Sequence, residues 1–302
     1  MLYDLIIIGA GPAGYTSAIY AARYKINTLV LAKEIGGLAM SAPKVENWPG
    51  VLGKTGIELM ADFKKHVEHY GVKILMEEIS DIKKENNLFT ILTETQHYQA
   101  KSIILALGSE RRKLNIPGEK ELTGKGVAYC ATCDAIFCKN KIIAVVGGGN
   151  SAAVSALLLS EYVSKVYMIY RKSKLKAEPI WVDQILKNKK IEIIYNANVI
   201  EAKGEKFLEK IVLDNKKELQ VGGLFIEIGA KPQTELAKCL NVKLDKNNLI
   251  IIDQACKTNV DGVFAAGDIT TGSNELKQIV TAASEGAISA TSVYEYLKAS
   301  NK

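Results

Sequence analysis

Two cysteines in the middle of the chain are spaced to act as a redox pair. Cys130 and Cys133 form a C-x-x-C motif, and thirteen residues separate Cys133 from the glycine-rich turn that begins at Gly147. An odd count of five cysteines argues against a secreted disulfide scaffold, and a zinc site would need a second pair or suitably spaced histidines. The pair is therefore predicted to be a redox-active dithiol, with no metal. The remaining cysteines are single: Cys138, Cys239 and Cys256.

Asp134 follows the pair directly and is the only acid in this stretch. A C-x-x-C cysteine reacts as a thiolate, and an adjacent carboxylate would raise the pKa of a thiol. Proton delivery to a leaving thiolate is therefore the expected role of Asp134, with a helix cap as the alternative. The segment DAIFCKN after the pair is expected to begin a short helix.

A glycine-rich turn between a strand and a helix opens the chain. Residues 3–8 are an uncharged apolar run, typical of a parallel strand buried on both faces, and residues 28–32 form a second such run. The turn between them allows a backbone to approach a pyrophosphate at a helix N-terminus; a glycine turn without a ligand is the alternative. Glu34 lies close to the place where such units carry an acid for the ribose. The motif G-A-G-P-A-G supplies Gly9, Gly11 and Gly14.

A second unit of the same kind follows the cysteines. A strand over 142–146, the turn GGGNSA, a helix to about residue 160 and a strand over 166–170 place Gly147, Gly149 and Ala152 in the G-x-G-x-x-A pattern. The second strand ends in a basic cluster that favours the 2′-phosphate of NADP(H) over NAD(H), with a solvated basic loop as the alternative. This cluster consists of Arg171, Lys172, Lys174 and Lys176.

The rest of the chain is typical of a two-domain globular protein of 302 residues. We expect a helix over 55–70, a small antiparallel meander over 72–99, a linker at 115–126 and a final helix from about Glu275. No apolar run approaches the roughly 20 residues that span a membrane, and the N-terminus is expected to be a buried strand, not a signal peptide. The net charge of +6 comes from scattered lysines without interleaved aromatic residues, which indicates solvated faces and not a nucleic-acid surface.

The two chemistries fit one electron path. A nicotinamide hydride and a dithiol both carry two electrons but do not exchange them easily, whereas a flavin in the first unit would accept the hydride and reduce the disulfide. Because the dithiol belongs to the second unit, one hinge motion would present either the nicotinamide or the disulfide to the flavin.

Together these motifs resemble the low-molecular-weight thioredoxin reductases of the flavin-dependent disulfide reductase class. The resemblance covers almost the whole chain, and CATCD just ahead of GGGNSA is its most specific part. The motifs that carry it are GAGPAG (9–14), VENWPG (45–50), CATCD (130–134), GGGNSA (147–152), GVFAAGD (262–268) and KQIVTAASEGA (277–287).

The resemblance implies an α/β fold of two Rossmann-like three-layer domains, the second inserted in the first. It implies FAD in a split domain of residues 1–112 and 240–302, and NADPH in residues 113–239 with the dithiol. It implies a homodimer that reduces thioredoxin or a thioredoxin-like protein, with Cys133 nearer the flavin and Asp134 as the acid. The cysteine usage, which argues against secretion, predicts a cytoplasmic protein. The implied FAD residues are Gly9, Gly11, Pro12, Ala13, Gly14, Glu34, Gly36, Gly37, Leu38, Asn47, Ala106, Leu107, Gly108, Gly267, Asp268, Lys277, Gln278, Ile279 and Ala282. The implied NADPH residues are Gly147, Gly148, Gly149, Asn150, Ser151, Arg171, Lys172, Lys176 and Gly229.

Four departures from the family pattern concern the cofactors. Ser155 stands where the family's G-G-G-x-x-A-x-x-E has its glutamate, and the family's H-R-R-x-x-x-R reads here as Tyr170, Arg171, Lys172 and Lys176. Lysine lacks the bidentate fork of arginine, so both changes bear on NADPH. Leu38 replaces a flavin-contacting glutamine and Lys277 an arginine, which concern FAD only.

Three alternatives follow. The same flavin and dithiol chemistry with NADH, a ferredoxin or a reduced flavin as donor is the second hypothesis. Ferredoxin–NADP reductases of similar architecture lack the C-x-x-C, which disfavours them. A binding or scaffold module with vestigial sites is disfavoured by two intact glycine turns beside CATCD.

Overall fold

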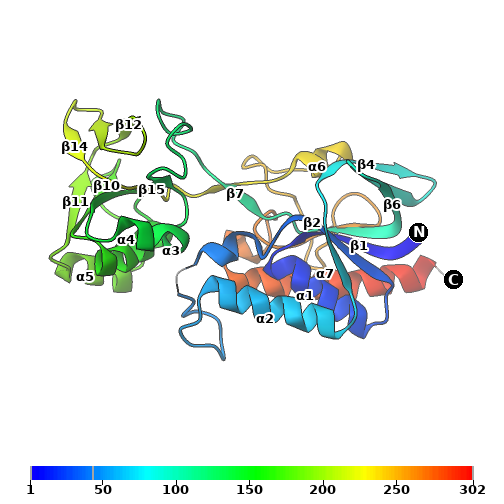
Figure 1. The fold of residues 1–302 in the computed structure, drawn as a ribbon. Coiled ribbons are helices and arrows are strands. Elements are labelled where there is room, and N and C mark those ends of the chain that lie inside the picture. Colours follow the sequence, from blue (N-terminus) through cyan, green and yellow to red (C-terminus); the bar gives the residue numbers. More distant parts are fainter. Residues whose placement is uncertain (1, 43, 301–302) are drawn as a thin grey trace. The chain divides into compact units, whose positions relative to one another are not determined.

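The computed structural model describes residues 2–42 and 44–300, and for Thr132, Cys133 and Glu275 the backbone alone (Figure 1). The chain divides into two compact units. The terminal unit comprises Met1–Met40, Lys44–Glu110 and Pro232–Lys302, and the inserted unit comprises Ser41–Pro43 and Arg111–Lys231. Within the described residues, no helix is long and apolar enough to cross a membrane.

The terminal unit is built on a seven-stranded sheet in the order β3-β2-β1-β6-β5-β4, with β17 paired to β6. Strands β2, β1, β6 and β17 are parallel. Their apolar side chains are buried because helices cover one face of the sheet and the other face packs in an apolar cluster with Ala237, Leu240 and Ile250. The strands are β1 (Leu2–Ala10), β2 (Thr28–Ile35), β3 (Lys73–Met76), β4 (Ile79–Glu85), β5 (Leu88–Thr93), β6 (His97–Leu105) and β17 (Val263–Ala265).

The helices α1 (Pro12–Arg23), α2 (Gly56–His69) and α7 (Ile279–Ser300) lie together on one face of this sheet (Figure 1). A reciprocal capping box starts α2, because Thr55 Oγ1 accepts from the backbone N–H of Glu58 and Glu58 Oε2 accepts from that of Thr55. The short elements η1 (Gly37–Ser41), α6 (Glu235–Cys239) and η3 (Ser273–Glu275) complete the unit, and the final helix begins at Ile279, after the expected Glu275.

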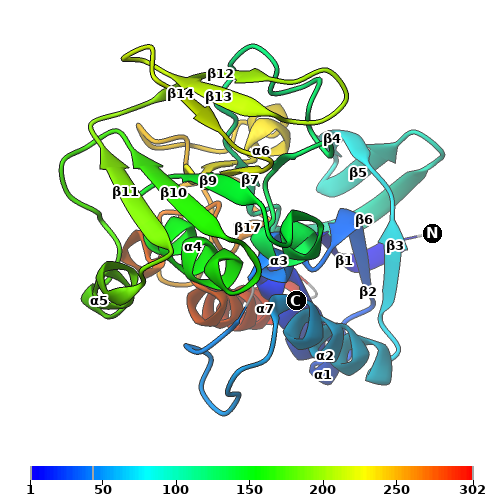
Figure 2. The ribbon, with the colours of Figure 1, turned by 60° about the vertical axis from the view of Figure 1, so that its left-hand side comes forward.

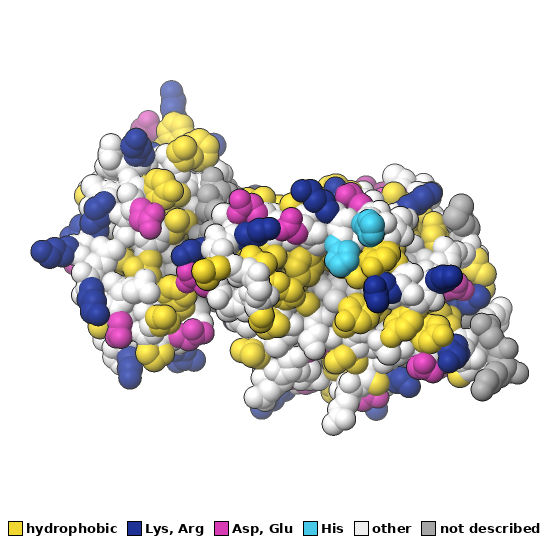
Figure 3. Space-filling view, turned by 90° about the horizontal axis from the view of Figure 1, so that it is seen from below, with side chains coloured by type: hydrophobic (Ala, Val, Ile, Leu, Met, Phe, Trp, Pro, Cys, Tyr) yellow, Lys and Arg dark blue, Asp and Glu magenta, His cyan; other side chains and the backbone are white. Residues whose placement is uncertain are grey.

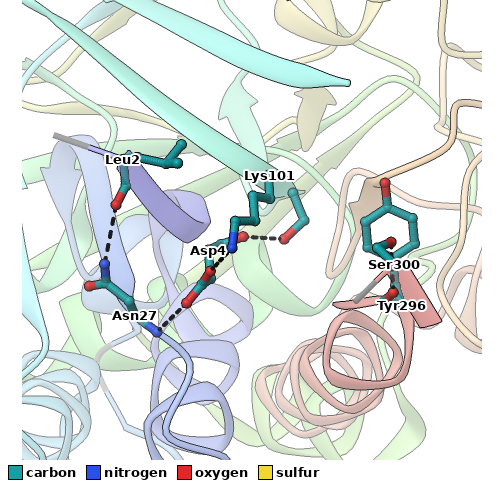
Figure 4. Close-up of polar contacts among 7 residues, drawn as sticks. Leu2, Asp4, Asn27, Lys101, Tyr296 and Ser300 are labelled. Carbon is teal, nitrogen blue, oxygen red and sulfur yellow. Dashed lines mark hydrogen bonds and ion pairs between the residues drawn. The ribbon is translucent and has the colours of Figure 1, made fainter. Parts of the chain in front are cut away.

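The amino end of the sheet is held by polar contacts that Figure 4 shows. The Asp4 carboxylate forms an ion pair of 2.8 Å with Lys101 of β6 and accepts from the backbone N–H of Asn27. The Asn27 amide donates to the Leu2 carbonyl, so β1, β6 and the approach to β2 are fastened at one end. The glycine turns lie at the opposite, carboxyl end of these strands.

Residues 72–99 only partly form the expected antiparallel meander. Strands β4, β5 and β6 pair in antiparallel fashion, whereas β3 pairs in parallel with β2. The physical reason is the helix α2 between β2 and β3, since a helical crossover returns the chain in the same direction.

The inserted unit has a five-stranded parallel sheet in the order β11-β10-β9-β15-β8 (Figure 2). One face packs against α4 (Asn150–Tyr162) and α5 (Pro179–Lys187), and the other against a three-stranded antiparallel sheet, so the unit has three layers. The parallel strands are β8 (Val127–Ala128), β9 (Ile142–Val146), β10 (Lys165–Tyr170), β11 (Ile191–Tyr195) and β15 (Leu224–Ile226). The small sheet contains β12 (Val199–Lys203), β13 (Lys210–Leu213) and β14 (Glu218–Gln220).

The chain passes between the units at β7 (Ser109–Arg111) and β16 (Ala230–Pro232), which pair with each other. The first crossing lies two residues before the expected boundary at 112/113. The second lies at 231/232 and not at 239/240, because Ala237 and Leu240 belong to the apolar core of the terminal unit. Residues 115–126, the expected linker, lie wholly inside the inserted unit.

The segment 115–126 is ordered by a buried carboxylate. Glu119 Oε1 accepts from the Leu114 N–H at 3.0 Å and from the Tyr129 hydroxyl at 2.6 Å, while Oε2 accepts from the Asn115 N–H at 2.5 Å. Burial raises the pKa of Tyr129, and its hydrogen bond to Glu119 raises it further. A segment whose glycines and proline suggest a linker is therefore a hydrogen-bonded loop of the inserted unit.

We predict that Glu119→Ala lowers the free energy of unfolding by about 3 kcal/mol, because several donors lose a charged acceptor inside the protein. Urea unfolding followed by circular dichroism measures this. Glu121→Ala, which removes an exposed carboxylate two residues away, is the matched control and should change it by less than about 0.5 kcal/mol. Equal unfolding midpoints for the two variants would contradict the role of Glu119.

Candidate nucleotide and dithiol sites

The first glycine turn has the geometry of a pyrophosphate cradle. Gly9 has φ +114, and a Cβ on it would lie 2.2 Å from the Ala106 carbonyl oxygen; a Cβ on Gly14 would lie 1.9 Å from the Gly9 oxygen. A Cβ on Gly11 would meet no atom of the described residues within 4 Å. The N-cap of α1 is Gly11 itself, which makes no side-chain cap hydrogen bond. Gly9 and Gly14 are thus required by packing, while Gly11 leaves open space in front of uncapped helix N–H groups, as a bound phosphate needs.

The other residues expected at FAD gather around this turn within the terminal unit. Pro12, Ala13 and Gly14 form the first turn of α1, and the Gly36 N–H donates to the Ala10 carbonyl at 2.7 Å. A Cβ on Gly37 would lie 3.4 Å from the Gly11 Cα, which brings the segment after β2 against the cradle. Exposed Glu34 is the second-last residue of β2, Leu38 lies in η1, and Ala106, Leu107 and Gly108 follow β6.

The C-terminal part of the chain reaches the same strand ends. Gly267 and Asp268 follow β17, and burial raises the pKa of Asp268. Asn47 Nδ2 donates to Gln278 Oε1 at 2.8 Å and so connects two expected residues that are far apart in the sequence. Lys277, Gln278, Ile279 and Ala282 lie at the start of α7.

Sequence reasoning missed one residue here, the buried Glu285 of α7. Its Oε2 accepts from the Gly267 N–H and from Thr270 Oγ1, both at 2.8 Å, and its Oε1 accepts from Ser273 Oγ at 2.6 Å. Glu285 therefore holds the turn that presents Asp268. The only signal was a charged residue at a buried face of the final helix, inside the motif KQIVTAASEGA.

The second glycine turn repeats the construction of the first. Gly147 has φ +145, and a Cβ on it would lie 2.2 Å from the Glu227 carbonyl oxygen, while a Cβ on Gly149 would meet nothing within 4 Å in the described part of the chain. The N-cap of α4 is Gly149, which makes no side-chain cap hydrogen bond. A Cβ on Gly148 would lie 2.5 Å from atoms of the Tyr170 ring, so the ring packs directly against this glycine. The turn lies between β9 and β15, the point where strand order reverses and where open α/β sheets bind nucleotides.

The loop after β10 is fastened to this turn. The Lys176 N–H donates to the Gly148 carbonyl at 2.6 Å, and the Asn150 amide exchanges two hydrogen bonds of 2.7 Å with Glu178. The side chains of Arg171, Lys172, Lys174 and Lys176 are exposed, and no carboxylate in the described part of the chain lies within ion-pair distance of them. Ser151 lies in the first turn of α4, and Gly229 follows β15.

The dithiol segment is built on the helix that carries this second turn. Cys130 is half-buried and disulfide-bonded, while Cys138, Cys239 and Cys256 are free thiols. The short helix α3 (Ala131–Asp134) begins inside the motif and continues as η2 (Ala135–Cys138), so the helical segment starts earlier than DAIFCKN suggested. The buried Ala131 and Ala135 share an apolar core with Ala152 and Ala153 of α4. The Cys133 side chain lies outside the described residues.

Asp134 ends α3 and is half-buried, and burial raises the pKa of its carboxyl. A carboxyl that keeps its proton to higher pH suits proton delivery to a thiolate. Cys138 is buried in the core of the inserted unit, where burial also raises its pKa, as expected of a packing residue and not a nucleophile. Beside the motif, Ile136 and Phe137 are 69% and 71% exposed.

A sequence profile described as pyridine nucleotide-disulphide oxidoreductase matches residues 3–286. The chain belongs to this family. Among its relatives, a thioredoxin reductase of Peptoclostridium acidaminophilum is 38% identical over 99% of this chain and 98% of the relative. The crystal structure of Lactococcus lactis thioredoxin reductase in its FR conformation superposes with a TM-score of 0.93 at 36% identity, covering 98% of this chain and 99% of that one.

These matches confirm the resemblance to thioredoxin reductases and the expected fold class of two Rossmann-like domains. Members of this pyridine nucleotide-disulphide oxidoreductase family depend on a flavin and a pyridine nucleotide. Another similar structure is a ferredoxin-flavin thioredoxin reductase of Clostridium acetobutylicum, with 32% identity, a TM-score of 0.54, and coverage of 99% of both chains. The name of this similar structure gives ferredoxin and not a pyridine nucleotide.

We predict that Gly11→Ala and Gly149→Ala separate the two nucleotide sites. Both added methyl groups enter open space, so both variants should fold, but each methyl stands where a pyrophosphate approaches the backbone. Gly11→Ala should be purified with less FAD, while Gly149→Ala should keep its FAD and bind NADPH about tenfold more weakly or worse. The flavin-to-protein absorbance ratio and an NADPH titration measure this, each variant serving as the control for the other. Full retention of both ligands by both variants would refute the assignment.

Proposed function

We propose that this protein is a thioredoxin-disulfide reductase that takes electrons from NADPH through FAD and the Cys130/Cys133 pair to thioredoxin or a thioredoxin-like protein. The observation that carries the proposal is the placement of disulfide-bonded Cys130 on a segment packed against α4, the helix of the second glycine turn. The terminal unit repeats that turn without a dithiol in the described residues. Two nucleotide cradles and one dithiol are the parts that such an electron path needs.

The terminal unit fits FAD. Gly11 leaves the backbone open in front of the uncapped N-terminus of α1, and Glu285 holds the turn that presents Asp268. When bound there, FAD supplies the chemistry of accepting a hydride and passing two electrons to a disulfide. The surrounding residues bind and orient it: the cradle takes the pyrophosphate, and the Asn47–Gln278 hydrogen bond fixes the loop before α2 to the start of α7.

The reaction is balanced by one proton. NADPH and one proton convert a disulfide to a dithiol and release NADP⁺, and thiol–disulfide exchange then transfers both electrons to the disulfide of the partner. Burial raises the pKa of the Asp134 carboxyl, which supports the proposal that Asp134 holds that proton. Ile136 and Phe137, exposed next to the motif, offer an apolar contact for the partner protein.

Support for NADPH comes from the basic cluster. Arg171 and Lys172 are exposed at the end of β10 without an acidic partner among the described residues, and the following loop is fastened to Gly148. Free cations at this strand end suit a 2′-phosphate. The competing donors are NADH, a ferredoxin or a reduced flavin, which the substitution of Ser155 for the family's glutamate favours.

We also propose a cytoplasmic homodimer. Figure 3 shows hydrophobic side chains on the helical face of the terminal unit, and the exposed apolar residues there include Tyr20 of α1, Ile57 of α2, and Val280 and Ile288 of α7. Apolar surface on adjoining helices supports self-association. Three free thiols among the described residues support a reducing compartment.

We predict that Cys130→Ser and Cys133→Ser each abolish NADPH-dependent reduction of a thioredoxin disulfide while NADPH still bleaches the oxidised flavin. The reason is that each serine removes the second electron step and leaves both nucleotide cradles intact. Anaerobic titration of the flavin absorbance and a thioredoxin-coupled assay measure the two steps, with Cys138→Ser as the control that should keep both. Turnover of thioredoxin at the wild-type rate by either variant would disprove the proposed electron path. A wild-type protein that dithionite bleaches but NADPH and NADH do not would assign the donor to a ferredoxin or a flavin.

We predict that the double variant Arg171→Ala/Lys172→Ala binds NADPH about 10- to 100-fold more weakly and NADH almost unchanged, because only NADPH carries the 2′-phosphate that these charges would contact. The dissociation constants of both nucleotides measure this. Lys187→Ala/Lys189→Ala, which removes two exposed lysines from the same unit, controls for net charge and should change neither. Equal losses for NADPH and NADH would show that Arg171 and Lys172 do not read the 2′-phosphate.

A further inference from the structure

A buried carboxylate that no sequence motif singles out stands at the second nucleotide turn. Glu227 directly follows β15, and its side chain is 3% exposed. Its backbone N–H donates to the Val146 carbonyl at 2.8 Å, and its own carbonyl oxygen lies 2.2 Å from where a Cβ on Gly147 would stand. Glu227 therefore lies against the first glycine of the turn, on the β15 side of the point where strand order reverses.

The Glu227 carboxylate has two partners, both within the inserted unit. Its Oε1 accepts from Ser155 Oγ at 2.9 Å, and its Oε2 forms an ion pair of 2.6 Å with Arg111 Nη1. Arg111 also donates through Nη2 to Ser41 Oγ. Ser155 occupies the α4 position at which the family pattern has glutamate. Glu227, at the end of the neighbouring strand β15, thus supplies the carboxylate that α4 lacks. It accepts a hydrogen bond from Ser155, the residue at the position of the family's glutamate.

The ion pair is better explained by positioning than by stability. Removing two charges from water offsets most of their attraction, so a buried pair contributes little more than apolar residues of the same size. The ion pair between Arg111 and Glu227 instead fixes the course of the chain directly after β15. The next turn is fastened as well, because the Arg112 N–H donates to the Gly229 carbonyl at 2.9 Å. Arg111, the last residue of β7, and Arg112, the residue after it, therefore hold residues 227–229 at both ends.

The position of this segment indicates which part of a dinucleotide it would contact. The basic cluster follows β10, on one side of β9, and the open Gly149 marks the place of the pyrophosphate. Residues 227–229 follow β15, on the other side of β9. A dinucleotide bound across the strand ends with its 2′-phosphate at the cluster places its nicotinamide half over β15.

We propose that Glu227, held by Arg111, is a positioning residue for the nicotinamide half of the donor and takes over the place of the family's glutamate at position 155. The inference rests on the proposed function, because it assumes that the inserted unit binds a nicotinamide dinucleotide. It assigns a role to three residues that the glycine motifs and the basic cluster leave unexplained: Arg111, Ser155 and Glu227.

The test compares ligands with and without the nicotinamide in the FAD-loaded protein. Glu227→Ser should weaken NADPH and NADH alike, by about tenfold, because both carry the same nicotinamide half. Binding of adenosine 2′,5′-bisphosphate, which has no nicotinamide, should stay unchanged. The reciprocal variant Ser155→Glu/Glu227→Ser returns a carboxylate to the site from α4 and should recover NADPH affinity to within about threefold of wild type.

Two further variants make the outcome decisive. Glu227→Gln keeps the size of the side chain and removes only its charge, so it tests the proposal where Glu227→Ser does not fold; it too should weaken NADPH and spare the bisphosphate. Glu192→Gln removes the charge of an exposed ion pair with Lys165 on the same sheet and should change no affinity.

Wild-type NADPH affinity in folded Glu227→Gln, or an equal loss for NADPH and the bisphosphate, would overturn the positioning role and leave the proposed donor standing. A wild-type protein that binds neither nicotinamide nucleotide would overturn the proposed donor and this inference together.

Discussion

The contact between the third position of each glycine motif and the end of the preceding strand sets the geometry on which both units depend. In the terminal unit a Cβ on Gly14 would collide with the Gly9 carbonyl, and in the inserted unit a Cβ on Gly147 would come within 2.8 Å of the Ala152 methyl. Only a small residue lets the helix begin this close to the strand, and only then do its free N–H groups face the opening at Gly11 or Gly149. The chain thus contains two glycine turns of one design, and the side chains around each turn must decide what it could bind.

The side chains around the two glycine turns differ in charge, but both sets include a buried glutamate. In each unit a buried glutamate fixes the backbone next to a strand end: Glu285 accepts from the Gly267 N–H after β17, and Glu227 accepts from Ser155 and pairs with Arg111 after β15. A buried carboxylate is costly without partners, and each of these has at least two. Side chains satisfied in this way hold neighbouring loops in one conformation, which suits sites that must receive a large ligand without rearranging.

Local patterns in the sequence were enough for the elements whose signals lie within a few residues. The strand at 142–146 has the predicted bounds, and the helix expected over 55–70 begins at a capping box formed by neighbours, Thr55 and Glu58. Errors arose where distant residues decide. The glycines of 115–126 suggested a linker because nothing nearby shows that Glu119 is buried, and the direction of β3 depends on pairing with β2. The Ser155–Glu227–Arg111 contacts join residues far apart in the chain, so no motif could have contained them.

The placement of Arg111 connects the second nucleotide turn to the segment that joins the units. Arg111 ends β7, one of the two paired strands through which the chain crosses, and its guanidinium reaches Glu227 beside the first glycine of the turn. The dithiol segment shares a core with α4, which begins at that same turn. Because a packed core behaves as one unit and not as separate atoms, the dithiol segment and the start of α4 have a fixed spacing. The Ser155–Glu227–Arg111 contacts join α4 in turn to the ends of β15 and β7, so one set of contacts links the glycine turn to the strand at which the chain enters the inserted unit.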